Sequence, residues 1–264
     1  MMSRKKKTLI TIFLILFGYS MVVLGNYLLD FYRSTVRIDE LERLMEEQAA
    51  VPDSSVTSPE SVMSASPEAA EPVMLPEFKE LYAQNSDIIG WLKIEGSLIS
   101  YPVMHTPLNA EFYLSRDFNR QESKSGLPFL DYRCSIDKPT TNWIIYGHNM
   151  KNGSMFHALM NYKNEAYYKE HPVIKLDTLY EQGEYEIIAV ILSKVYRKDE
   201  DVFKFYQFVN AETQTEFDSF IQNVKQLALY DTGLSAQYGD QLLTLTTCEY
   251  STENGRLAVI ARRI

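Results

Sequence analysis

The chain has 264 residues and a formal net charge of −9, with 26 Lys and Arg against 35 Asp and Glu. This acidic balance argues against nucleic-acid binding, because contacts with phosphates need clustered cations. Two cysteines, Cys134 and Cys248, are too few for a disulfide framework or a CxxC zinc site, although one Cys134–Cys248 bridge stays open. We therefore expect no metal ion and no cofactor.

The first hydrophobic segment is long enough to cross a membrane. Residues 8–29 carry no charge, and about 22 helical residues at about 1.5 Å each span a bilayer core of roughly 30 Å. Residues 1–7 form a basic tail, which the positive-inside rule assigns to the cytoplasm. We predict a single-pass anchor with the rest of the chain outside the cell. The alternative is a cleaved signal peptide, but the segment is longer than a usual signal core and residues 25–29 offer no A-x-A cleavage site.

Two segments of different character follow the predicted anchor. Residues 30–48 are charged and helix-prone. Their apolar positions at helical spacing are Ile38, Leu41, Leu44 and Met45. This stripe is shorter than two heptads, which favours a juxtamembrane stalk helix over a dimerising coiled coil. Residues 49–75 are rich in Pro, Ser, Glu and Ala without apolar periodicity, so we predict a disordered linker.

Residues 76–264 are predicted to form an extracellular globular domain. After a short helix that begins at Pro76, strand-like segments bounded by Gly, Pro, Asn or Asp occur at residues 91–94, 100–104, 127–131, 142–146, 173–176 and 184–195. Short strands without a βαβ alternation indicate an antiparallel barrel or sandwich. Two helical interruptions are expected, at residues 154–169 and 199–229, and the second should pack one face on the sheet.

A histidine lies at the end of one predicted strand. His148 follows the run Trp143-Ile144-Ile145-Tyr146-Gly147, and strand-to-loop junctions are where catalytic groups are commonly presented. His105 also follows a strand and is the second candidate. His157 falls within a predicted helix, and His171 precedes a proline at a strand start. Position therefore favours His148 as a catalytic base or acid.

The C-terminal hairpin brings a thiol close to a cation. Alternation along residues 242–248 places Thr246 and Cys248 on the less apolar face of a strand. A turn then leads to Arg256, which opens the next strand-like run, residues 257–261. A hairpin would return Arg256 to the side of Cys248. A cysteine beside a fixed cation is suited to nucleophilic attack on a carbonyl, because the cation can stabilise the oxyanion.

These residues resemble the motifs of the sortase family. Thr244-Leu245-Thr246-Thr247-Cys248 is similar to the TLxTC motif, and Arg256 stands where the family's active-site arginine falls. Residues 142–149 resemble the strand that carries the sortase histidine, and residues 125–133 are also similar to that family. The resemblance covers about residues 75–264. It implies a closed β-barrel of about eight strands, mixed or antiparallel, with an N-terminal helix and a long helical insertion before the catalytic strand.

The resemblance also implies a mechanism. Cys248 would attack the carbonyl after Thr in the C-terminal sorting signal of a secreted surface protein and form a thioester. His148 would protonate the leaving amine, then accept a proton from the amine of a peptidoglycan precursor. Arg256 would hold the oxyanion with the Glu249 backbone N–H as a second donor, and Thr246 would contact the substrate. The product would be a protein anchored to the cell wall.

Within the family, the chain is most similar to class B. The features that resemble class B are Tyr-Gly-His-Asn-Met at residues 146–150, the Met155-Phe156 helix, the long insertion and the absence of a second membrane segment. A pilin-polymerising sortase is the alternative within the family. A protease that hydrolyses the thioester and a non-catalytic peptide-binding barrel are the alternatives in function. Three acidic residues could complete a triad, and the sequence does not distinguish among them: Asp131, Glu249 and Glu253.

Overall fold

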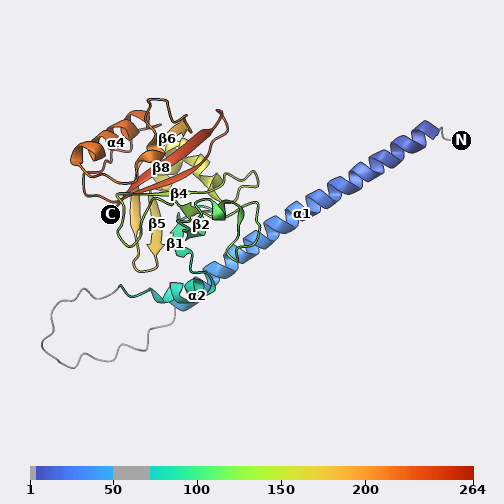
Figure 1. Ribbon diagram of the computed structural model, residues 1–264, viewed down its shortest axis with the longest axis horizontal. Coiled ribbons are helices and arrows are strands. Elements are labelled where there is room, and N and C mark those ends of the chain that lie inside the picture. Colours follow the sequence, from blue (N-terminus) through green and yellow to red (C-terminus); the bar gives the residue numbers. More distant parts are fainter. Residues whose placement is uncertain (1–3, 50–71) are drawn as a thin grey trace, which may run out of the picture.

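The computed structural model describes residues 4–49 and 72–264 (Figure 1). Residues 50–71 of the predicted linker at residues 49–75 therefore lie outside the described residues. The helices are α1 (Arg4–Ala49), α2 (Pro76–Gln84), η1 (Phe112–Ser115), η2 (Phe156–Lys163), α3 (Glu165–Glu170), η3 (Phe205–Gln207) and α4 (Gln214–Leu227). The strands are β1 (Ile88–Lys93), β2 (Ser100–Met104), β3 (Phe129–Leu130), β4 (Asn142–Tyr146), β5 (Val173–Thr178), β6 (Glu184–Lys194), β7 (Leu242–Cys248) and β8 (Gly255–Arg263).

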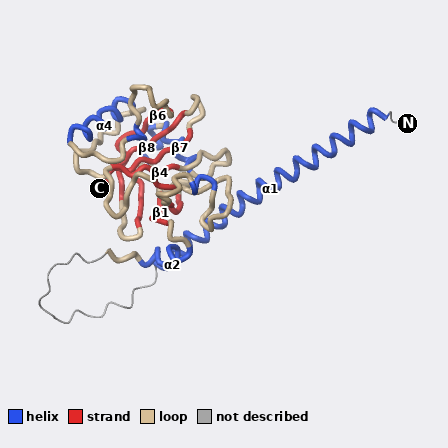
Figure 2. Tube along the Cα trace, in the orientation of Figure 1, coloured by secondary structure: helices blue, strands red, loops and turns tan. Residues whose placement is uncertain are grey.

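The described strands close into a barrel in the order β1-β2-β3-β4-β7-β8-β6-β5. Figure 2 shows the strands gathered in one body with helices at its periphery. Closure leaves no free sheet edge, which confirms the barrel and excludes the sandwich. The sheet is mixed, because β2 pairs parallel with β3 and β4 pairs parallel with β7. The antiparallel arrangement predicted from strand spacing is therefore wrong for these two pairs, and connection length alone could not reveal them.

The parallel pair β4–β7 decides where the site forms. Its register aligns Tyr146 with Thr246. Parallel strands end at the same rim of a barrel, so the residues that follow these two positions emerge together. They are Gly147 and His148 after β4, and Thr247 and Cys248 after the aligned position on β7.

Both faces of the sheet around β7 are buried. Leu243 and Leu245 point into the barrel core, whereas Leu242 packs outward against a second cluster. That outer cluster includes Phe217 and Val224 of α4, both fully buried. The amphipathic helix thus covers the outer face, as expected, and removes its apolar side from water.

The long helix predicted at residues 199–229 is wrong in extent. Within that segment, regular structure is confined to η3 and α4. Helix α4 begins at a capping box, in which the Thr213 side chain accepts from the Glu216 N–H and the Glu216 carboxylate accepts from the Thr213 N–H. Such a box fixes the helix start at Thr213, so the aromatic residues at 203–208 lie outside the helix. The other predicted interruption, at residues 154–169, matches η2 and α3 closely.

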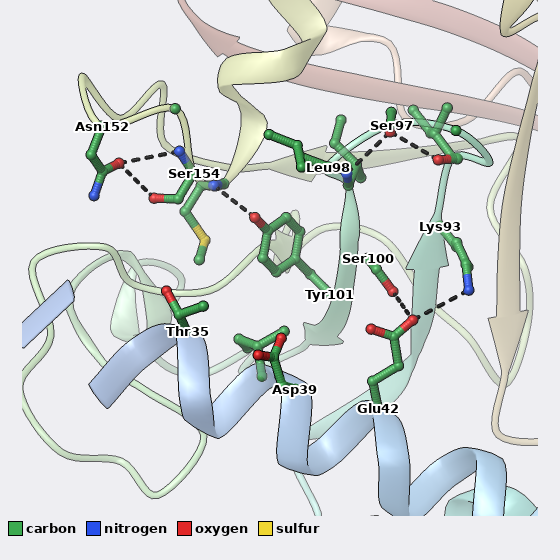
Figure 3. Close-up of a pocket in the computed structure, with 16 residues that line it drawn as sticks. Thr35, Asp39, Glu42, Lys93, Ser97, Leu98, Ser100, Tyr101, Asn152 and Ser154 are labelled. Atoms are coloured by element: carbon green, nitrogen blue, oxygen red, sulfur yellow. Dashed lines mark hydrogen bonds and ion pairs between the residues drawn. The ribbon is translucent and has the colours of Figure 1, made fainter. Parts of the chain in front are cut away.

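Helix α1 is continuous and contacts the barrel through its C-terminal part. Its N-terminal half projects away from the barrel (Figure 1), and residues Leu9–Leu29 have a mean hydropathy of 2.1, apolar enough to cross a membrane. The stripe predicted for a stalk packs instead against the domain, with Leu41 fully buried. Glu42 accepts hydrogen bonds from Ser100 at 2.7 Å and Lys93 at 3.2 Å (Figure 3). The helix is therefore fixed to β1 and β2.

Candidate functional site

Cys248 and Arg256 face each other across the β7–β8 hairpin. They are direct cross-strand partners in the antiparallel register, so their side chains are neighbours on one face. The tight turn needs Gly255, because a Cβ there would lie 2.3 Å from the Glu249 carbonyl oxygen. Cys248 is a free, partly exposed thiol. The Arg256 guanidinium donates to the Gly255 carbonyl at 2.9 Å and has no carboxylate partner among the described residues, so its charge stays available.

His148 reaches the same rim from the end of β4. The Gly147 N–H continues the ladder by donating to the Thr246 carbonyl at 3.2 Å, and the chain then turns away with His148. The His148 Nε2 lies 2.8 Å from the Leu114 carbonyl oxygen. A carbonyl only accepts, so Nε2 carries the hydrogen and the neutral ring keeps Nδ1 as its acceptor. The ring is thus oriented by a backbone group rather than by an acid.

A pocket of about 310 Å³ brings the predicted trio together. Cys248, His148 and Arg256 all line it. The rest of the wall is largely apolar and aromatic: Leu114, Phe129, Tyr146, Val195, Phe205 and Tyr206. A mostly apolar pocket with a few convergent polar groups is the usual form of a ligand site, and this volume is in the range that such sites have.

A larger pocket of about 470 Å³ lies elsewhere, between α1 and the β1–β2 hairpin (Figure 3). Asp39 and Tyr101 line it together with the loop at residues 152–155. It contains none of the three predicted catalytic residues. The smaller pocket is therefore the candidate active site.

Thr246 lines the active-site pocket, but its hydroxyl is already used. The side chain is 1% exposed, and Oγ1 donates to the Leu257 carbonyl at 3.1 Å. The hydroxyl thus stabilises the hairpin. A substrate contact at Thr246 would be made by its methyl group rather than by a hydrogen bond.

The Glu249 N–H does not point to the pocket as an oxyanion donor. It donates to the Gly255 carbonyl at 2.9 Å, because the hairpin ladder continues one residue past Cys248. The Glu249 carboxylate accepts from Lys163 at 2.5 Å and from the Ser251 hydroxyl at 2.5 Å. These bonds, chiefly that from Lys163, hold the pKa of Glu249 below its usual range. Both the N–H and the carboxylate of Glu249 are therefore already bonded within the protein.

The other acidic candidates for a triad are also placed elsewhere. Asp131 accepts from Arg133 at 2.7 Å and from the Tyr146 hydroxyl at 2.9 Å. Burial acts to raise the pKa of Asp131, but the bonds and charge of Arg133 hold it below its usual range. Glu253 is exposed in the β7–β8 turn. In the part of the chain that is described, no acidic side chain bonds His148.

The remaining candidates are structural. His105 does not line the pocket, and its burial lowers its pKa. Cys134 is 4% exposed and unpaired, and burial raises its pKa to about 11, so it is an inert core thiol. Both cysteines are free, so the disulfide bridge between Cys134 and Cys248 that the sequence allows is not formed. Over the described residues, no group of three His, Cys, Asp or Glu side chains could hold a metal ion.

One residue at the site was missed from the sequence. Asn149 directly follows His148, and its Nδ2 donates to the Cys248 carbonyl at 2.9 Å. It is 7% exposed. The signal available was a short polar side chain immediately after the candidate histidine at a strand end, a position where Asn often bonds to nearby backbone.

Comparisons with known proteins identify the family of the chain. The Sortase domain family matches residues 92–264. Sortase B of Staphylococcus aureus is 30% identical over 191 residues, which cover 72% of this chain and 75% of that protein. Sortase B of Listeria monocytogenes is 34% identical over 185 residues, covering 69% and 72%. The crystal structure of sortase B from B. anthracis has a TM-score of 0.70 and 26% identity, covering 89% of this chain and 98% of that one.

Proposed function

This chain belongs to the sortase family of cysteine transpeptidases, in class B, and from that membership we propose that Cys248, His148 and Arg256 are its catalytic residues. The observation that carries the proposal is the convergence of the three side chains, from strands β7 and β8 and the loop after β4, on one largely apolar pocket. The substrate is proposed to be the C-terminal sorting signal of a secreted protein, cleaved after Thr.

The first half-reaction forms a thioester. His148 Nδ1 takes the proton of the Cys248 thiol, the resulting thiolate attacks the carbonyl carbon of the Thr residue, and the carbonyl oxygen becomes an oxyanion that Arg256 stabilises. Arginine suits this task because it stays charged and presents its donors in a fixed fork. The C–N bond then breaks, and the departing amine takes a proton from His148. Because Nε2–H is bonded to Leu114, Nδ1 is the ring atom proposed to exchange that proton.

The second half-reaction transfers the protein. An amine of a peptidoglycan precursor attacks the thioester carbonyl, His148 takes the proton that the amine loses, and the thiolate leaves as the new amide forms. With water in place of the amine, the same steps give hydrolysis. The ratio of the two products therefore distinguishes the transpeptidase from the protease alternative.

The apolar wall of the pocket suits an extended peptide. Phe129 and Tyr146 stack with ring centroids 5.6 Å apart, and Phe205 and Tyr206 also line the pocket. Aromatic surfaces of this kind bury apolar side chains of a bound segment and exclude water from the thioester. Removing water favours transfer to an amine over hydrolysis. We assign the sorting signal to this surface.

The membrane-spanning role of residues 8–29 is part of the proposal. A helix of this length and hydropathy, preceded by a basic tail, supports an anchor with the N-terminus in the cytoplasm and the barrel outside. A membrane-impermeant maleimide should label Cys248 in intact cells. Labelling only after the membrane is permeabilised would indicate the opposite orientation, with the barrel in the cytoplasm.

The catalytic assignment can be tested with the full chain in detergent micelles. A library of sorting-signal peptides is incubated with and without amines, including glycyl peptides, and products and protein adducts are followed by mass spectrometry. We expect an acyl adduct on Cys248 and an amine-dependent product. Cys248→Ala should abolish both, whereas the matched exchange Cys134→Ala should retain them. Undiminished cleavage by Cys248→Ala would contradict the assignment.

A further inference from the structure

The Asn149 side chain connects the loop that carries His148 to the strand that carries Cys248. Its Nδ2 donates to the backbone carbonyl of Cys248 itself at 2.9 Å, and its Oδ1 lies 2.7 Å from Nδ1 of His157. We propose that Asn149 is a positioning residue that sets the geometry between His148 and Cys248. This inference rests on the proposed function of those two residues and extends it to two side chains that do not line the pocket.

The first argument comes from the parallel ladder of β4 and β7. The Gly147 N–H donates to the Thr246 carbonyl at 3.2 Å. In a parallel ladder the next bond lies two residues further on each strand, so the Cys248 carbonyl would receive the backbone N–H of Asn149. The chain instead turns away, and the Phe156 N–H donates to the His148 carbonyl at 2.8 Å. The Asn149 side-chain amide then supplies the bond that the backbone no longer makes.

The second argument concerns the orientation of this amide. Turning the amide over would place Oδ1 against the Cys248 carbonyl oxygen, two acceptors in contact. The donor to Cys248 therefore fixes Oδ1 toward His157, whose Nδ1 must carry the hydrogen. The hydrogen bond from His157 thus holds the Asn149 amide in the orientation that keeps Nδ2 on the Cys248 carbonyl.

A third bond strengthens the connection. The Tyr250 hydroxyl donates to the Asn149 backbone carbonyl at 3.2 Å. His148 is thus flanked by two attachments to β7, Gly147 to Thr246 before it and Asn149 to Cys248 after it. Because the second acceptor is the carbonyl of the nucleophile, the bond fixes the His148 backbone relative to the Cys248 backbone. Loss of this bond should impair proton transfer and leave the peptide-binding wall intact.

The main test is Asn149→Asp in the full chain in detergent micelles. Aspartate has the same shape and can still accept from His157, but it lacks the donor for Cys248. A displacement of about 1 Å between reacting groups costs up to about 100-fold in rate, so we expect kcat for thioester formation to fall about 10- to 100-fold with KM within about threefold. Alkylation of Cys248 by iodoacetamide should stay within about threefold of wild type, because the thiol remains exposed.

The matched control is Asn152→Asp on the same loop. The Asn152 side chain only accepts, through Oδ1 from the Ser154 N–H and hydroxyl, and an aspartate can accept both bonds. It introduces the same charge and should retain wild-type kcat. His157, which is exposed, gives a second test that does not change a buried group. His157→Phe removes the donor to Oδ1 and should lower kcat several-fold, whereas His157→Gln can donate and should restore it.

The outcomes separate this inference from the proposed function. No thioester in the wild type would overturn the proposed function and this inference with it. A wild type that turns over, with Asn149→Asp and His157→Phe both within threefold of its kcat, would overturn this inference alone. It would also be overturned if alkylation and the unfolding temperature of Asn149→Asp fell in step with kcat, because that pattern indicates a purely structural role. A selective loss of kcat supports it.

Discussion

Gly147 is the position at which the smallest change should have the largest effect on the site. A Cβ added there would lie 2.6 Å from two ring atoms of Phe156, which is fully buried. Carbon atoms rest at about 3.5–4.0 Å, so either the ring or the strand end must retreat by about 1 Å. Gly147→Ala should therefore destabilise the domain by about 1–3 kcal/mol, the usual cost of overpacking. Since His148 is the next residue, kcat should fall about 10- to 100-fold.

A double-mutant cycle tests this reasoning. Phe156→Ala removes the Cγ and Cδ atoms that oppose the new methyl group, so Gly147→Ala should cost less stability and turnover in the Phe156→Ala background than in the wild type. The assays are denaturant unfolding and thioester formation by the full chain. Gly25→Ala is the matched control, because a Cβ there meets nothing within 4 Å. Strictly additive effects of the two exchanges would refute the steric account.

Three further exchanges test other parts of the structure. Arg256→Ala should lower kcat about 10²- to 10³-fold, the cost of removing an oxyanion donor, and Arg256→Lys should recover only part of it; a loss confined to KM would assign Arg256 to binding instead. Lys163→Ala should destabilise the domain by at most about 1 kcal/mol at neutral pH. The bond from Lys163 lowers the pKa of Glu249 in the folded state. The difference in unfolding free energy between wild type and Lys163→Ala should therefore be fully present above the unfolded-state pKa of about 4.3 and vanish as pH falls through the folded-state pKa. Urea unfolding across pH measures it. Leu41→Ala should weaken the docking of α1 by about 2–5 kcal/mol and speed hydrogen exchange in its last turns, whereas exposed Val36→Ala should not.

The parts of the site that were predicted from sequence depend on local relations. Cys248 and Arg256 belong to one hairpin, so alternation and turn length suffice to place them opposite each other. His148 was found because a strand and its end can be recognised in a short window, and β4 has the predicted bounds of residues 142–146. No periodicity in the sequence relates the Cys248–Arg256 hairpin to the strand end at His148. Only the resemblance to sortases indicates that they belong to one site.

The parts that were missed depend on contacts between distant segments. Nothing in residues 38–45 distinguishes a stripe that faces solvent from one that packs on the barrel, and Glu42 finds Lys93 and Ser100 only once the chain is folded. The sequence does not show where the β7–β8 ladder ends, because its last hydrogen bond, from the Glu249 N–H to the Gly255 carbonyl, depends on the conformation of the turn. The prediction of a free Glu249 N–H is therefore wrong. Asn149 was overlooked because its acceptor lies on a strand far along the chain.

The chemistry follows from one junction in the barrel, where a parallel pair of strands adjoins an antiparallel pair. β7 is shared by both, so its C-terminal end meets the C-terminal end of β4 and the N-terminal end of β8 at a single rim. The proposed base, nucleophile and cation therefore all line one pocket. Had β4 run antiparallel to β7, its five residues at about 3.3 Å each would carry His148 roughly 16 Å away, to the opposite rim. Because no side chain spans that gap, the direction of β4 is a requirement of the proposed mechanism.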